Sequence, residues 1–111
     1  MPTRAFSDDE YQSAFYENAP IPIAFVGRDG AFISCNEAWC EMVGYARAEL
    51  ESLRFQDITY HEDLGGDEDM VRRCLAGELD GYSMAKRYVM KEGGLVWIRL
   101  HVRVILSLIH I

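Results

Sequence analysis

The chain has 111 residues, of which 50% are hydrophobic and 26% charged, a balance typical of one globular domain that is large enough to fold alone. No apolar run approaches the ~20 residues of a membrane-spanning helix, and the first residues lack the apolar core of a signal peptide, so we expect a cytoplasmic protein without direct membrane contact. The net charge of −7 is concentrated in residues 1–80, which hold 17 acidic and 6 basic residues, and this acidity argues against nucleic acid as a partner.

The N-terminal segment, residues 1–18, is predicted to form a helix. Ser7 and Glu10 have capping-box spacing, in which a serine caps the first turn and a glutamate three residues later bonds back to it. The helix should end near Asn18, because two prolines follow and proline cannot continue a helix. We therefore treat residues 1–18 as a helical cap or dimerisation helix that precedes the main domain.

Two short strands and a capped helix come next. Residues 21–26 and 31–35 are rich in strand-forming side chains, and the Arg-Asp-Gly sequence between them predicts a turn. Asn36 is a plausible cap for a helix over residues 37–43, and Gly44 is a plausible stop. These segments predict a hairpin followed by a short helix.

The middle of the chain is predicted to be helical in two places. A short helix is expected over residues 47–53, and residues 55–63 are expected to be irregular and polar. A longer helix should run to Leu75 from about Leu64 or Asp67, and its start stays open because two adjacent glycines weaken the first turn.

The last third of the chain predicts a long β-hairpin. Its turn is Lys91-Glu92-Gly93-Gly94, where glycine can supply the positive φ that a tight turn needs. The run after the turn alternates strictly, which predicts a strand with one buried face. The expected inner face comprises Val96, Ile98, Leu100, Val102 and Val104. The expected outer face comprises Trp97, Arg99, His101 and Arg103.

Strands at both ends with helices between them predict an α+β domain, in which one antiparallel sheet is covered by helices on one face. We place this domain at residues 19–106 and a truncated tail at residues 107–111. The tail has no glycine, proline or aspartate that could make a turn. We therefore expect residues 105–111 to pack against a neighbouring molecule or to be disordered.

Four motifs resemble those of the PAS sensor family, in its bacterial form with a C-terminal PAC motif. Residues 17–26 with the Arg-Asp-Gly turn resemble the family's opening strand, and residues 36–45 resemble its "N-x-A…G-Y" helix. Residues 57–63 stand where the family often has "ITHPED", and residues 86–97 resemble "KRYIRKDGSxVW". The resemblance covers about residues 6–106 and implies a curved sheet of about five strands with helices on its concave side.

The resemblance also implies a function. We expect a non-enzymatic sensory and dimerisation module of a larger bacterial signalling protein, such as a sensor histidine kinase or a diguanylate cyclase. It would bind a small molecule in an inner apolar pocket and relay the signal to an output domain. A ligand-free dimerising relay and a haem-bound sensor stay as alternatives.

The expected ligand-binding residues are the apolar side chains that would converge between helices and sheet. They are Phe25, Phe32, Trp39, Met42, Ile58, Met70, Cys74, Ile98 and Leu100. The same residues could form an ordinary packed core with no ligand. Two methionines, which fill irregular gaps, and a tryptophan that can donate a hydrogen bond favour a pocket.

A homodimer is expected through the N-terminal helix. Tyr11, Ala14 and Phe15 form one apolar stripe on it, and such a stripe needs cover. That cover is either the outer sheet face around Trp97 or the same helix of a second chain.

No cofactor or metal is required by the sequence, and no motif for a catalytic centre is present. Light-sensing PAS proteins hold flavin through a cysteine, but Leu53 stands at that position here, which argues against a flavin adduct. His61 could be a haem ligand, although a histidine in this segment of the family commonly orders the helix entry. The three cysteines form no CxxC pair and are expected to be reduced thiols.

Overall fold

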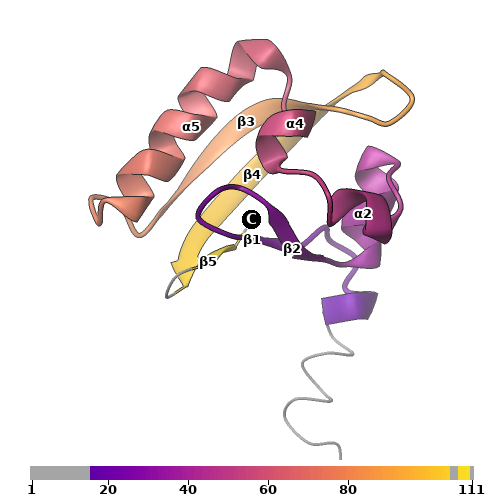
Figure 1. The fold of residues 1–111 in the computed structure, drawn as a ribbon, viewed down its shortest axis with the longest axis horizontal. Coiled ribbons are helices and arrows are strands. Elements are labelled where there is room, and N and C mark those ends of the chain that lie inside the picture. Colours follow the sequence, from indigo (N-terminus) through magenta and orange to yellow (C-terminus); the bar gives the residue numbers. More distant parts are fainter. Residues whose placement is uncertain (1–15, 106–107, 111) are drawn as a thin grey trace, which may run out of the picture.

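The computed structural model describes residues 16–105 and 108–110, which form one five-stranded antiparallel sheet with helices on one side (Figure 1). The elements are β1 (Ala24–Val26), β2 (Phe32–Cys35), α2 (Glu37–Val43), α3 (Arg47–Leu50), α4 (Phe55–Ile58), α5 (His61–Leu75), β3 (Gly81–Val89), β4 (Leu95–Ile105) and β5 (Leu108–His110). The strand order is β2-β1-β5-β4-β3, so β2 and β3 are the edges. The predicted α+β fold class is confirmed.

The β3–β4 hairpin is the longest pairing of the sheet, from Gly81 opposite Arg103 to Val89 opposite Leu95. The predicted alternation along β4 is confirmed. Leu100 and Val102 are 3% exposed on the inner face, whereas Trp97 is 63% exposed on the outer face. The hairpin turn contains Gly93 at φ 103°, a conformation that favours glycine.

Asn36 explains why the chain turns from β2 into α2. It is completely buried, and its Oδ1 accepts hydrogen bonds from the backbone N–H of Trp39 at 3.0 Å and of Ile23 at 2.9 Å. Its Nδ2 donates to the carbonyl oxygens of Tyr16 and Ile21. One side chain therefore caps the helix and fastens the strand entry to it, as the sequence led us to expect for the cap.

Several element bounds differ from the prediction, and the short helix expected over residues 47–53 ends at Leu50. The first strand begins at Ala24 rather than Ile21, because Pro22 lacks an N–H group and the Ile21 carbonyl already accepts from Asn36. Residues 55–63 are also not irregular: Phe55–Ile58 forms the one-turn helix α4, and His61 begins α5. The Asp57 carboxylate accepts from the Arg54 backbone N–H at 2.8 Å, which caps α4.

The expectation for the tail is wrong for its described residues. Leu108–His110 forms β5, which pairs with β4 on one side and with β1 on the other. Ile105 lies opposite Leu108, so only two residues connect the strands, and a connection this short can close an antiparallel hairpin. Pairing stabilises β5 in this place, because it satisfies backbone N–H and C=O groups of β1 and β4.

The first described residues of the chain reach the outer face of β1 and β2. Residues 16–18 are helical, and the Tyr16 ring packs against Phe25 with centroids 5.8 Å apart. The Tyr16 hydroxyl is hydrogen bonded to Ser34 Oγ at 2.8 Å. The stripe Tyr11, Ala14 and Phe15 lies outside the described residues. Within the part of the chain that is described, no helix has the length and apolarity needed to span a membrane.

Candidate functional site

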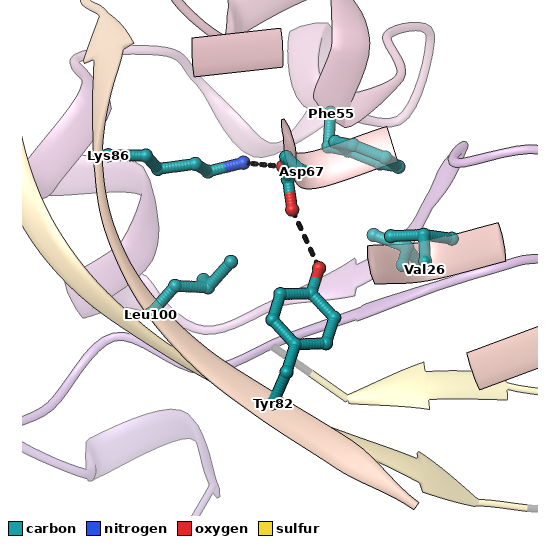
Figure 2. A pocket seen from close by; sticks show the side chains of 7 residues that line it. Val26, Phe55, Asp67, Tyr82, Lys86 and Leu100 are labelled. Atoms are coloured by element: carbon teal, nitrogen blue, oxygen red, sulfur yellow. Dashed lines mark hydrogen bonds and ion pairs between the residues drawn. The ribbon is translucent and has the colours of Figure 1, made fainter. Parts of the chain in front are cut away.

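A charged pair lies in the interior between α5 and the sheet. Lys86 lies on the inner face of β3, as do Tyr82 and Tyr88. Its ammonium is paired with the Asp67 carboxylate of α5 (Figure 2). The two side chains are 0% and 1% exposed. The Lys86 Nζ also donates to Thr59 Oγ1 at 3.1 Å, and the Tyr82 hydroxyl donates to the other Asp67 oxygen at 2.6 Å. We call Lys86, Asp67, Tyr82 and Thr59 the interior polar cluster.

Aromatic rings complete the surroundings of the ammonium. The Lys86 Nζ lies 4.5 Å from the centroid of the Tyr88 ring and 5.1 Å from that of Phe55. Such contacts stabilise a cation most where water is excluded. The interior therefore holds a positive charge by three means: a carboxylate, a hydroxyl and two ring faces.

A small cavity adjoins this cluster. Its volume is about 10 Å³, which is roughly the space that one water molecule requires. Its walls are Val26, Phe55, Asp67, Val71, Tyr82, Lys86 and Leu100, all of which are drawn in Figure 2. The cavity combines apolar walls with one ammonium, one carboxylate and one phenol, which is the composition of a small-molecule site on a reduced scale.

Burial governs the protonation of these groups. It lowers the pKa of the Lys86 ammonium, against the opposing effect of the Asp67 carboxylate. Burial, reinforced by the neighbouring carboxylate, raises the pKa of Tyr82 well above its usual value, and burial does the same for Tyr88. Both phenols therefore stay neutral, and Tyr82 acts as a hydrogen-bond donor.

A second contact joins the same two elements at the edge of the sheet. Arg87, the residue after Lys86, points outward and binds Asp63 through its guanidinium at 2.9 and 3.0 Å and through its backbone N–H at 2.8 Å. This pairing lowers the pKa of the Asp63 carboxyl. Consecutive residues of β3 thus hold Asp63 and Asp67, which are four residues apart on α5. This arrangement fastens the first half of the helix to the sheet by polar contacts.

The predicted ligand-binding residues are only partly brought together. Phe32, Trp39, Ile58 and Leu100 belong to one buried cluster, against which Met42 and Ile98 pack. Cys74 is buried on α5, whereas Met70 is partly buried with its sulfur 3.9 Å from an Arg73 nitrogen. Phe25 is not part of the interior, because it shares the outer face with Ser34 and packs on Tyr16. Of the nine, Leu100 alone lines the cavity beside Lys86.

A larger groove of about 450 Å³ contains four of the predicted residues, Trp39, Met42, Ile98 and Leu100. The rest of its wall is Ile21–Ile23 on one side and Arg99 with His101 on the other. The pairing of β5 explains its position, because a strand continued in the register of β5 would run between these two walls. The groove thus lies where a strand could fit in the sheet, with the backbone of a neighbouring segment on each side.

The interior polar cluster was missed by sequence reasoning, although a signal existed. Tyr82, Met84 and Tyr88 alternate along β3, so the same period places Lys86 on the inner face. Asp67 precedes Val71 and Cys74 by four and seven residues, which places it on the buried side of α5. Both positions were overlooked because charged side chains are ordinarily exposed.

The other candidate groups lie elsewhere. His61 is exposed at the start of α5, with its ring 4.5 Å from that of Tyr60, and His101 is hydrogen bonded to Ser83 on the outer face. Burial raises the pKa of Cys35 to about 12, which keeps that thiol protonated. Within the described ranges, no group of three His, Cys, Asp or Glu side chains is arranged to bind a metal ion.

With this geometry in hand, the chain can be compared with known proteins. Residues 32–107 match the family model described as "PAS fold", and the chain belongs to this family. A probable diguanylate cyclase of Escherichia coli (strain K12), DgcE, is 37% identical over 99 residues, which cover 89% of this chain and 9% of that protein. The chain thus spans about a tenth of the length of that relative.

Solved structures agree with this assignment. A domain of a sensory box histidine kinase/response regulator from Geobacter sulfurreducens has a TM-score of 0.80 at 20% identity, covering 92% of this chain and 89% of that one. The PAS domain of a LuxR-family regulator from Burkholderia thailandensis, solved in complex with ethanol, has a TM-score of 0.73 at 19% identity over 88% and 90% of the two chains. These structures share the fold of this chain, which agrees with its membership of the PAS family.

Proposed function

We propose that this domain is the non-enzymatic, cytoplasmic sensory input of a larger bacterial signalling protein. It binds a small molecule in the interior beside Lys86 and relays occupancy to an output domain of the diguanylate cyclase or histidine kinase type. The similarity to a probable diguanylate cyclase and to a histidine kinase domain supports this class of output.

The observation that carries the proposal is the charged pair in the core. A buried ion pair contributes little net stability, since removing two charges from water costs about as much as their attraction returns. An apolar pair of similar size would serve a purely structural core at least as well. Ionisable groups beside a cavity are typical of functional sites. A PAS domain of the same fold has been solved with ethanol, so the fold can accommodate a small molecule.

The large groove is a weaker candidate for the ligand. Its two walls follow the register of a strand neighbouring β1 and β4, and main-chain groups there are suited to strand pairing. The interior cavity, in contrast, presents fixed side-chain donors and an acceptor within apolar walls. We therefore place the ligand in the interior.

A ligand-free relay is the second candidate, and one observation favours it. The cavity of about 10 Å³ has room for no more than about one water molecule, so a ligand must displace something. In this alternative the domain transmits a signal through its dimer alone. The exposed Trp97 and the basic side chains Arg99 and Arg103 on the outer sheet face would then meet the N-terminal helix or a second chain.

Native mass spectrometry of the purified 111-residue chain tests the proposal. We expect a species heavier than the polypeptide by the mass of one small molecule, released on denaturation and identified in the extract. Arg103→Ala, on the outer face, is the matched control and should retain the added mass. A polypeptide that carries no ligand and whose melting temperature no metabolite raises would favour the ligand-free relay.

Sedimentation tests the dimer separately. The chain should sediment as a dimer, and removal of residues 1–15 should lower its apparent mass while Tyr16 keeps its contact with Phe25. An unchanged dimer after this removal would exclude the helix from the interface, and Trp97→Ala would then test the outer sheet face.

A further inference from the structure

We propose that Asp67 is a resident counter-ion of Lys86 which the carboxylate of a ligand replaces, so that the interior of this domain recognises short-chain carboxylic acids. The inference rests on the proposed function and names the chemical class of its ligand. It comes from the interior polar cluster of this chain, in which a cation on a fully paired strand meets an anion on a half-helix that buries no other side chain.

Lys86 is the fixed partner. Its backbone lies in the middle of the β3–β4 ladder, opposite Ile98, with paired residues on both sides. Its side chain is completely buried, and Thr59, Tyr88 and Phe55 surround the ammonium. A buried ammonium without a counter-ion costs several kcal/mol, so the interior requires an anion at this place in every state in which Lys86 is charged.

Asp67 is the partner that can leave. The α5 segment from His61 to Met70 buries no other residue, and the buried Val71 and Cys74 follow it. Gly65 and Gly66 stand directly before Asp67, and a Cβ at either position would meet no atom within 4 Å. Packing therefore does not require these glycines, and each lowers helix stability by about 1 kcal/mol relative to alanine.

Arg87 of β3 also holds this half of the helix, because its guanidinium binds Asp63 and its carbonyl oxygen accepts from the backbone N–H of Tyr60 at the start of α5. The Arg87 and Asp63 side chains are 21% and 14% exposed, and Glu62, which also contacts Arg87, is 58% exposed. This contact lies at the edge of the sheet and is partly accessible to water, whereas the contact of Asp67 is completely buried. The first half of α5 is thus fastened by the buried contact of Asp67 and by the partly exposed contacts of Arg87, so the release of Asp67 exposes no other buried side chain of this half.

The chemistry of the site specifies the ligand. Asp67 receives two hydrogen bonds, from the Lys86 ammonium and from the Tyr82 hydroxyl, and any carboxylate at the same place can receive both. The adjoining walls Val26, Val71 and Leu100 are apolar, so the body of the ligand should be a hydrocarbon. The body must be short, because the space comprises the small cavity and the volume that Asp67 vacates.

Binding of butyrate compared with butyramide tests the inference. The two compounds are of similar size, and only butyrate carries a charge; sodium chloride keeps the ionic strength constant. Calorimetric titration of the 111-residue chain should show butyrate binding at least tenfold tighter than butyramide. Asp67→Asn should bind butyrate at least tenfold tighter than the wild type, because the ligand no longer competes with a resident anion. Lys86→Met should bind both compounds equally.

Asp69→Asn is the matched control, since Asp69 lies on the same helix but is half exposed and pairs only with Arg72 within the described chain. It should bind butyrate as the wild type does. If Asp67→Asn is unfolded, butyrate should refold it, as measured by circular dichroism, and butyramide should not. Failure of butyrate to refold it, or to bind the folded variant more tightly, overturns the inference.

The outcomes separate this inference from the proposed function. Equal binding of butyrate and butyramide to the wild type would overturn charge recognition while leaving a small-molecule sensor. Failure of butyrate to bind both the wild type and Asp67→Asn would also overturn the inference. The proposed function is decided by the co-purified mass, which involves neither compound.

Discussion

Removal of the Asp67 carboxylate should destabilise the domain more than removal of any exposed carboxylate. Asp67→Ala leaves the Lys86 ammonium buried without a counter-ion, which costs about 3–5 kcal/mol. Tyr82 also loses its acceptor, and an unsatisfied buried hydroxyl costs about 1–3 kcal/mol, part of which overlaps with the first cost. A domain of this size is stable by only about 5–15 kcal/mol, so the variant should be close to unfolding at room temperature.

The matched double variant isolates the interaction from the loss of packing. Lys86→Met with Asp67→Leu replaces both charges by apolar groups of similar volume and should lie within about 2 kcal/mol of the wild type, or above it. The measurement is urea unfolding followed by circular dichroism, with the slope compared between variants. At about 4–8 °C per kcal/mol, a cost of about 3–5 kcal/mol should lower the melting temperature of Asp67→Ala by about 12–40 °C.

Two results would refute this reasoning. One is a cost below about 1 kcal/mol for Asp67→Ala, which is the range of an exposed pair. The other is a double variant whose cost equals the sum of the costs of Lys86→Met and Asp67→Leu measured singly, because the effects of independent sites add and those of coupled sites do not. Asp69→Ala, on the exposed side of α5, should change the stability by less than about 0.5 kcal/mol and serves as the control.

Three further predictions concern other parts of the fold. Leu100→Ala should cost about 2–5 kcal/mol and Arg99→Ala less than about 1 kcal/mol in the same urea assay, because they lie on opposite faces of β4; the reverse order would invert the faces. Gly81→Ala should cost about 1–3 kcal/mol, since its Cβ would collide with the Val102 carbonyl oxygen, and a neutral effect would contradict this close approach. Arg87 lowers the folded-state pKa of Asp63, so the stability that this carboxylate contributes is complete above pH ~4 and is lost as pH falls through the folded-state pKa. The difference in stability between the wild type and Asp63→Asn should therefore shrink on acidification, and a constant difference would disprove the pairing.

The fold was largely predictable because its strongest signals are periodic. The alternation along β4 specified which face is buried, and Asn36 and Gly44 specified both ends of α2. The element bounds that failed depend on contacts distant in sequence. Ile21 leaves the first strand because its carbonyl bonds Asn36, and β5 joins the sheet because it lies between β1 and β4. Local patterns carry no information on such partners.

The candidate site was less predictable for a different reason. Apolar side chains inside a domain look alike in sequence whether they line a ligand or pack a core, and the nine expected residues mostly form the core. The informative residues are charged ones on inward positions. Lys86 lies on the inner face of β3 by its spacing alone, and its pairing with Asp67 depends on how α5 lies alongside β3 (Figure 1).

The contact of Arg87 with Trp97 links the fluorescence of this tryptophan to the position of α5. The chain has two tryptophans: Trp39 is 2% exposed, whereas Trp97 is 63% exposed and its ring lies 4.5 Å from the Arg87 guanidinium. The same guanidinium holds Asp63 on α5, so movement of that helix end would alter the surroundings of Trp97. In a Trp39→Phe background, the emission of the remaining indole would follow the attachment of the helix in real time, without a chemical label.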